Sequence, residues 1–177
     1  VCHGYTSKAK HMAGFVNKFY SLGYNVLAAD ARAHGDSEGT KIGMGWPERF
    51  DVIEWIKLII SWDSNAQIIL HGVSMGAATV LMASGEELPE NVKVIIADCG
   101  YTSEWDEFKC EANALHIPWF PVLNAASVLS RLRDGYDFKQ ASALEKVKQS
   151  RIPTLFIHGS DDELVPYSML DKLYSAA

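Results

Sequence analysis

The chain has 177 residues, of which 48% are hydrophobic and 21% are charged, and its formal net charge is -6 at pH 7. This length and composition are typical of one globular domain with its own core. The negative charge and the absence of a Lys/Arg cluster argue against nucleic-acid binding, which requires neutralisation of phosphates. Cys2, Cys99 and Cys110 lack metal-ligand spacing, so we expect reduced thiols and no metal site, with a Cys99–Cys110 bridge as the alternative.

Near-continuous apolar runs alternate with amphipathic stretches along the chain. The runs cover 24–30, 67–73, 92–98 and 152–159, and the amphipathic stretches cover 8–22, 47–62, 75–87 and 166–176. Continuous hydrophobicity is typical of strands that are covered on both faces, as in a parallel sheet. The alternation therefore predicts an α/β fold, with a doubly wound, mostly parallel sheet and flanking helices.

The segment 101–138 interrupts this alternation. It is too long for a simple connection between strands, and it is rich in large apolar residues. We therefore predict a single domain over 1–177, with a helical cap insertion at about 101–138 that folds over the edge of the sheet. The first residues, VCHG, read as the end of a strand. We expect the chain to be truncated at both ends.

The stretch GVSMG at 72–76 places Ser74 between two glycines, after one apolar run and before a helix-forming run. A G-x-S-x-G turn in this context raises the serine hydroxyl above a sheet, as a nucleophile elbow does. Gly72 and Gly76 allow close packing beside a strained residue. A turn of small residues without chemistry is the alternative interpretation.

A nucleophilic serine needs donors for the oxyanion that forms in its tetrahedral intermediate. We expect one donor to be the backbone N–H of Met75, the residue after Ser74. The stretch HGYTS at 3–7 supplies a second loop, in which Gly4 permits close approach and the Tyr5 N–H can point inward. His3 alone is a weak signal, since a structural histidine at a strand end is the more common case.

These elements together resemble the α/β-hydrolase superfamily, and in particular the bacterial serine esterases and lipase-like hydrolases with a short cap. The resemblance rests on four stretches in the family's order: HGY at 3–5, DARAHGDSEG at 30–39, GVSMG at 72–76 and HGSDDELVP at 158–166. In the second stretch Ala33 replaces the usual glycine. The resemblance implies that Asp30, Arg32 and His34 order the loop beside the pocket.

The resemblance also implies a catalytic acid after the last predicted strand. The pattern places it at Asp162, with Asp161 one position out of register and Asp98 as the alternative acid after an earlier strand. A carboxylate there can hold an imidazole in the tautomer that accepts a proton from serine.

The histidine of the triad is not found after Asp162. We expect it to come from the missing C-terminal part, with His116 in the cap as a remote alternative. His71 and His158 precede the serine and acid turns, and we expect both to point elsewhere. The fragment alone is then expected to be nearly inactive.

The predicted reaction is hydrolysis of a small-molecule carboxylic ester through an acyl-enzyme, without metal or organic cofactor. Four cap residues are candidates for an acyl pocket, namely Trp105, Leu115, Trp119 and Phe120. The same residues can equally be plain cap core. A peptidase, a thioesterase, an acyltransferase and a non-catalytic binding protein are alternatives on the same fold. A cytoplasmic enzyme and one that is exported or anchored by an upstream segment also remain alternatives.

Overall fold

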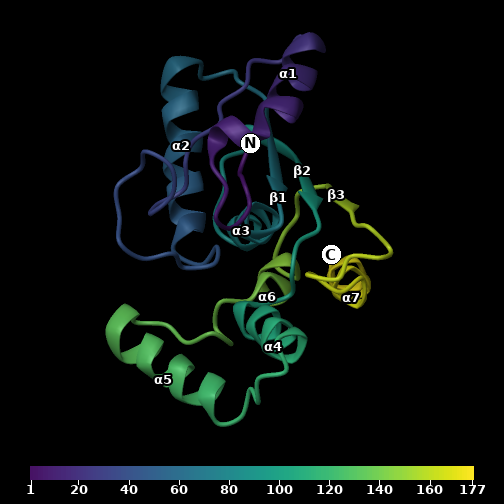
Figure 1. The fold of residues 1–177 in the computed structure, drawn as a ribbon. Helices are drawn as coiled ribbons and strands as arrows, with labels where there is room; N and C mark the ends of the chain where they lie inside the picture. The colour runs from purple at the N-terminus through teal and green to yellow at the C-terminus, as the bar shows by residue number, and fades with distance from the viewer.

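The computed structural model describes residues 1–177 and has a short parallel sheet with helices on both faces (Figure 1). The sheet has the order β1-β2-β3, formed by β1 (Ile68–Val73), β2 (Val92–Asp98) and β3 (Thr154–Ile157). In the register Val73 pairs with Asp98, and Asp98 pairs with Ile157. The carboxyl ends of all three strands therefore meet at one edge, and the predicted parallel α/β class is confirmed.

Helices form in all four predicted amphipathic stretches, two more form within the predicted insertion, and the short helix Ala143–Val147 lies outside both. They are the 3-10 helix η1 (Ala9–Met12) and the α-helices α1 (Ala13–Ser21), α2 (Glu48–Trp62), α3 (Met75–Ser84), α4 (Glu104–Ala114), α5 (Val122–Asp134), α6 (Ala143–Val147) and α7 (Ser168–Ala176). No helix combines the length and the apolar character needed to cross a bilayer. All three cysteines are free thiols.

Helix α3 forms the centre of the core, and all ten of its residues are buried. It packs against β1, β2, α2 and α6, so that Leu70 and Ile95 lie in the same apolar cluster as the α3 side chains. The opposite face of β1 carries His71, whose ring contacts Phe15 and Phe19 of α1 with centroids 4.6 and 5.4 Å apart. Both faces of β1 are therefore covered, which explains its unbroken hydrophobicity.

The strand predicted at 24–30 does not form, and the segment is irregular. It runs beside the first residues of the chain, where the Val1 amino group donates to the Leu27 carbonyl over 2.8 Å. On the other side, Cys2 exchanges backbone hydrogen bonds with His71 and Val73 of β1. A ladder needs several successive backbone pairs. The short N-terminal stretch supplies a single bond to this segment, and the strand prediction was wrong for that reason.

The segment after β2 contains α4 and α5, which lie beyond the carboxyl edge of the sheet (Figure 1). Ser103 caps α4 by accepting a hydrogen bond from the Asp106 N–H, and it also pairs with Ser142 in an isolated bridge. The rings of Phe108 and Phe138 meet edge to face at 4.9 Å. These contacts join α4 to the segment 138–142; the role of 101–138 as a cap stays a prediction, and we keep the word cap for this segment.

Candidate active site

Ser74 lies at the sharp turn between β1 and α3, with φ 54° and ψ -118°. A positive φ at a residue with a side chain stores roughly 1–3 kcal/mol of strain, which the surrounding structure must hold. The Ser74 N–H donates to the Asp98 carbonyl over 2.8 Å, and the Ser74 carbonyl accepts from the Ala78 N–H of α3. Both neighbouring elements thus hold the serine at the carboxyl edge of the sheet.

The two glycines of the turn are required by close backbone packing. A Cβ atom at Gly72 would lie 2.2 Å from the Gly76 carbonyl oxygen, and one at Gly76 would lie 2.3 Å from the Cys2 carbonyl oxygen. Backbone atoms of the sheet and helix cannot move away as a flexible side chain can. The local geometry is a strained turn between a strand and a helix, which is the geometry that the predicted elbow requires.

Residues 4–7, which we call the oxyanion loop after the role that the sequence predicts for them, pass directly beside this turn. A Cβ atom at Gly4 would be 3.4 Å from Ser74 Cβ and 3.8 Å from Ser74 Oγ. The Tyr5 N–H makes no hydrogen bond within the protein. Met75 is the first residue of α3, so its N–H belongs to the free donors of a helix N-terminus. Two backbone N–H groups therefore lie on the segments that flank the serine hydroxyl.

His34 fixes the oxyanion loop by a hydrogen bond. Its Nε2 accepts a hydrogen bond from the Thr6 N–H over 3.2 Å, and its Nδ1 lies 2.9 Å from the Arg32 carbonyl oxygen. An Nε2 that accepts and an Nδ1 that donates require the neutral ring with its proton on Nδ1. The sequence motif indicated an ordering role for this loop, but the bond from His34 to Thr6 could not be read from it.

His3 is fixed in the same way. Its Nε2 accepts from the Ala31 N–H over 2.9 Å, and its Nδ1 lies 2.8 Å from the Gly4 carbonyl oxygen. Burial lowers the pKa of His3, which favours the neutral ring that these bonds require. The His3 and His34 rings meet edge to face at 5.1 Å. The interpretation of His3 as a structural histidine agrees with this bonding.

Asp162 lies in the loop after β3, on the same edge as Ser74. Its Oδ1 accepts hydrogen bonds from the N–H groups of Leu164 and Val165, at 3.0 and 2.9 Å. The Nε2 of His158 is 3.6 Å from Asp162 Oδ2 and 2.8 Å from the Val165 carbonyl oxygen. The His158 ring thus contacts the loop that carries Asp162, in agreement with the expectation that it does not point toward Ser74. Asp161 makes only a 3.4 Å contact with its neighbour Ser160.

Asp98 ends β2 and stands between Ser74 and the Asp162 loop. Burial raises the pKa of Asp98, and the nearby Asp162 raises it further, while His158 opposes the shift. A carboxyl whose ionised form is disfavoured is the poorer choice for holding an imidazolium. Burial also raises the pKa of the adjacent Cys99 to about 11, so this thiol stays protonated at neutral pH.

The four cap residues predicted as an acyl pocket do not line the cavity that adjoins the start of α3. That cavity, of about 1030 Å³, lies between α2, the segment 23–32 and β1, and reaches Met75 and Gly76. The rings of Trp105 and Trp119 meet each other at 6.4 Å. Leu115 and Phe120 are 65% and 66% exposed. The Phe120 ring also meets Trp119, at 6.3 Å, so these contacts fit the alternative of cap packing, and the acyl pocket at these residues stays a prediction.

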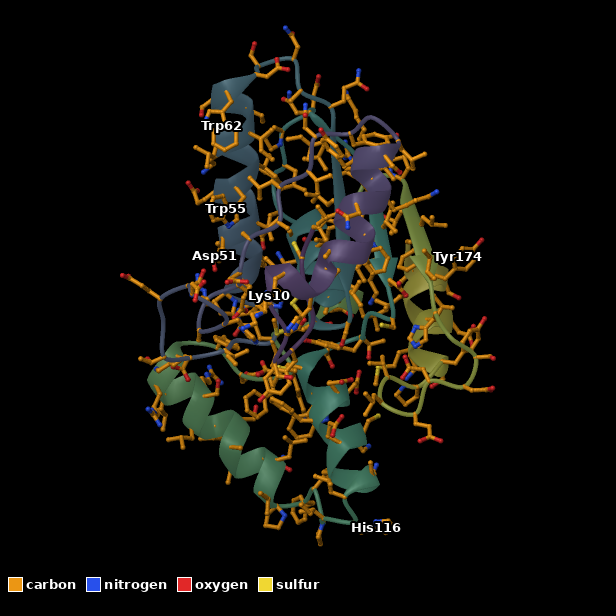
Figure 2. All side chains as sticks on the ribbon, turned by 45° about the horizontal axis from the view of Figure 1, so that its top comes forward. Lys10, Asp51, Trp55, Trp62, His116 and Tyr174 are labelled. Atoms are coloured by element: carbon orange, nitrogen blue, oxygen red, sulfur yellow. The ribbon has the colours of Figure 1, made fainter.

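The remaining histidines, His116, His11 and His71, lie on three different segments of the chain. Figure 2 shows His116 at the tip of the cap, at the opposite end of the molecule from Trp62 on α2. His11 lies 3.3 Å from the Ser7 hydroxyl. Burial lowers the pKa of His71 to about 4, in keeping with its position under the aromatic rings of α1.

Comparison with known proteins finds relatives by sequence and relatives by structure. The chain is 32% identical over 176 residues to the uncharacterized protein YqkD of Bacillus subtilis, covering 98% of this chain and 58% of that protein. It is 30% identical over 173 residues to the lysophosphatidylserine lipase ABHD12 of Macaca fascicularis, covering 97% of this chain and 42% of that protein. The chain thus spans about half the length of these curated relatives.

Among solved structures, the chain is similar to the Pyrococcus furiosus esterase Pf2001, with a TM-score of 0.77 and 26% identity. The match covers 99% of this chain and 66% of the esterase. A lipase-esterase related protein from Clostridium acetobutylicum shares the fold, with a TM-score of 0.71 and 21% identity over 99% of this chain and 79% of that protein. The model of the family described as serine aminopeptidase, S33, matches residues 1–136. With its parallel sheet, its elbow and this match, the chain belongs to the serine aminopeptidase S33 family of the α/β-hydrolase superfamily.

Proposed function

We propose that the protein is a serine hydrolase that cleaves carboxylic esters through an acyl-enzyme intermediate. The observation that carries the proposal is the strained Ser74 at the N-terminus of α3, with the oxyanion loop packed against it. Relatives named as a lipase and an esterase support ester hydrolysis as the reaction class.

In the proposed reaction, Ser74 Oγ attacks the ester carbonyl carbon while its proton passes to a histidine base. The carbonyl oxygen becomes an oxyanion that accepts hydrogen bonds from the Tyr5 and Met75 N–H groups. Collapse of the intermediate breaks the C–O bond, and the alcohol leaves with the proton from the imidazolium. Water then attacks the acyl-enzyme, and the carboxylate product is released. These steps need no cofactor.

Asp162 is the proposed acid and Asp98 the alternative. Asp162 stands on a loop at the strand ends, and its Oδ1 is already anchored by two backbone N–H groups. Its Oδ2 has only the 3.6 Å contact with His158 Nε2, which is itself 2.8 Å from the Val165 carbonyl oxygen, so Oδ2 can receive another imidazole N–H. We propose that this imidazole belongs to a residue outside 1–177, since His3 and His34 use both ring nitrogens within the oxyanion-loop network.

The proposed substrate is a small-molecule ester with a hydrophobic acyl or aryl group. The cavity beside Met75 and Gly76 supports this choice, since 19 of the 35 residues that line it are hydrophobic. The family description names an aminopeptidase, so cleavage of an amide by the same serine is the second candidate.

The test is hydrolysis of p-nitrophenyl esters of graded chain length by the full-length protein, beside aminoacyl p-nitroanilides. The variant Ser74→Ala should reduce ester turnover by about 10⁴-fold or more. Asp98→Asn and Asp162→Asn form a matched pair, and the larger loss should fall on Asp162→Asn. Undiminished hydrolysis in Ser74→Ala would overturn the nucleophile assignment. A preference for anilides over esters would favour the peptidase.

A further inference from the structure

Helix α5 of the cap has an inverted pattern of burial. Its inward face consists mainly of small or polar side chains, among them Ser127 and Ser130, with Leu123 as the large apolar residue. Its outward residues include Leu129 and Leu132, which are 51% and 79% exposed. A helix that only covers a protein core places its leucines inward. The outward face of α5 is therefore suited to contact with an apolar environment.

The outward face is also bordered by positive charge. Successive helical residues turn by about 100°. Val122, Ala125, Val128, Leu129 and Leu132 then form one continuous stripe. Arg131 falls on one border of this stripe and Arg133 on the other. We call this stripe with its two arginines the α5 face.

Figure 1 shows α5 at the outer edge of the cap, with α4 beside it. The loop before it, 115–121, adds the exposed side chains of Leu115, Ile117 and Phe120. From 115 to 133 there is no Asp or Glu, although the whole chain has a net charge of -6. Neither arginine takes part in an ion pair, whereas the next residue, Asp134, pairs with Lys41. The positive charge of the α5 face is thus available to a ligand.

We propose that the α5 face docks on an anionic lipid surface. An apolar stripe flanked by arginines is the pattern of a helix that lies in a membrane interface, with its leucines among the acyl chains and its guanidinium groups at the headgroups. Anionic headgroups attract the two arginines of the α5 face. Because the protein as a whole is negative, it orients with the cap toward the lipid. Docking would bring the cap, and the serine site beneath it, to a surface that holds esters. The binding itself does not depend on the proposed catalysis.

The experiment measures binding of the full-length protein to phosphatidylglycerol and phosphatidylcholine vesicles by sedimentation. We expect preferential binding to phosphatidylglycerol that weakens with salt, and a loss of about tenfold or more in Leu129→Ser/Leu132→Ser. Arg131→Gln/Arg133→Gln should remove the preference for phosphatidylglycerol. The matched control is Leu22→Ser, an exposed leucine at the end of α1. It should bind as the wild type does, and so should Ser74→Ala whether or not the wild type hydrolyses esters.

A local reporter separates the α5 face from any other lipid contact. An environment-sensitive NBD dye attached at Val128→Cys should brighten and shift to the blue on phosphatidylglycerol vesicles, while the same dye at Leu22→Cys should not. Equal responses at the two sites would overturn the proposal. Wild-type binding by the leucine variant would also overturn it. A change from dimer to monomer in that variant, without a change in lipid binding, would assign the α5 face to a second copy of the chain instead.

Discussion

The substitution Glu104→Gln tests how a buried carboxyl at the start of α4 makes stability depend on pH. Glu104 is the first residue of α4 and is only 3% exposed. Its Oε2 is buried and makes no hydrogen bond within the protein. Burial raises the pKa of Glu104 from 4.5 to about 8, and the nearby Glu48 and Asp134 contribute to the shift. At neutral pH the folded protein therefore keeps a proton on this carboxyl.

The sign and size of the effect follow from linkage. Below pH 4.5 the carboxyl is protonated in both states, and stability is unaffected by its titration. Between pH 4.5 and 8 the unfolded chain releases the proton and the folded protein retains it, so stability falls as pH rises. Each pH unit costs about 1.4 kcal/mol, which gives a cost of about 3 kcal/mol at pH 7. Glutamine has the same shape and does not titrate, so this pH-dependent cost disappears.

The assay is urea unfolding followed by tryptophan fluorescence at pH 4.5, 6, 7 and 8. Burial of the amide in Glu104→Gln lowers the free energy of unfolding by the same amount at every pH. This constant cancels when the difference in free energy of unfolding between variant and wild type is compared between pH values. We expect that difference to change by about 3 kcal/mol in favour of the variant from pH 4.5 to pH 7. Glu90→Gln, at an exposed site, removes one carboxyl and serves as the control. A difference that stays constant across this range would refute the reasoning.

Three further predictions concern the site. Asp162→Asn should lower kcat by about 10⁴-fold in ester hydrolysis by the full-length protein, because the imidazole loses its orienting carboxylate; a near-normal kcat would remove Asp162 as the acid. Gly76→Ala should lower the free energy of unfolding by more than about 3 kcal/mol, because its Cβ would lie 2.3 Å from the Cys2 carbonyl oxygen. Gly14→Ala, with open space around it, is the control, and equal melting temperatures would contradict the packing argument. His34→Ala should lower kcat by about tenfold to a hundredfold with little change in KM, since it releases the oxyanion loop; an unchanged kcat in steady-state assays would show that the loop holds without it.

The elbow around Ser74 could be predicted because its causes are local. A buried strand, two glycines and a helix-forming run follow one another within a few residues, and each has a direct conformational reason. The helices at 9–21, 48–62, 75–84 and 168–176 were similarly predictable from periodicity, whereas α6 was not predicted. The acid loop was placed through a family pattern, and the structure adds the bond that the pattern does not contain, between His158 and the loop's own backbone.

What the sequence by itself determined was the alternation of strands and helices, the parallel class of the sheet and the strained turn at Ser74. Each of these depends on residues that are close along the chain. Only the tertiary structure decided that 24–30 stays irregular, that His34 bonds to Thr6 and that Glu104 is buried beside Glu48. The outward leucines of α5 belong to this second group, because a helical pattern defines two faces and the packing of other segments selects which one is covered.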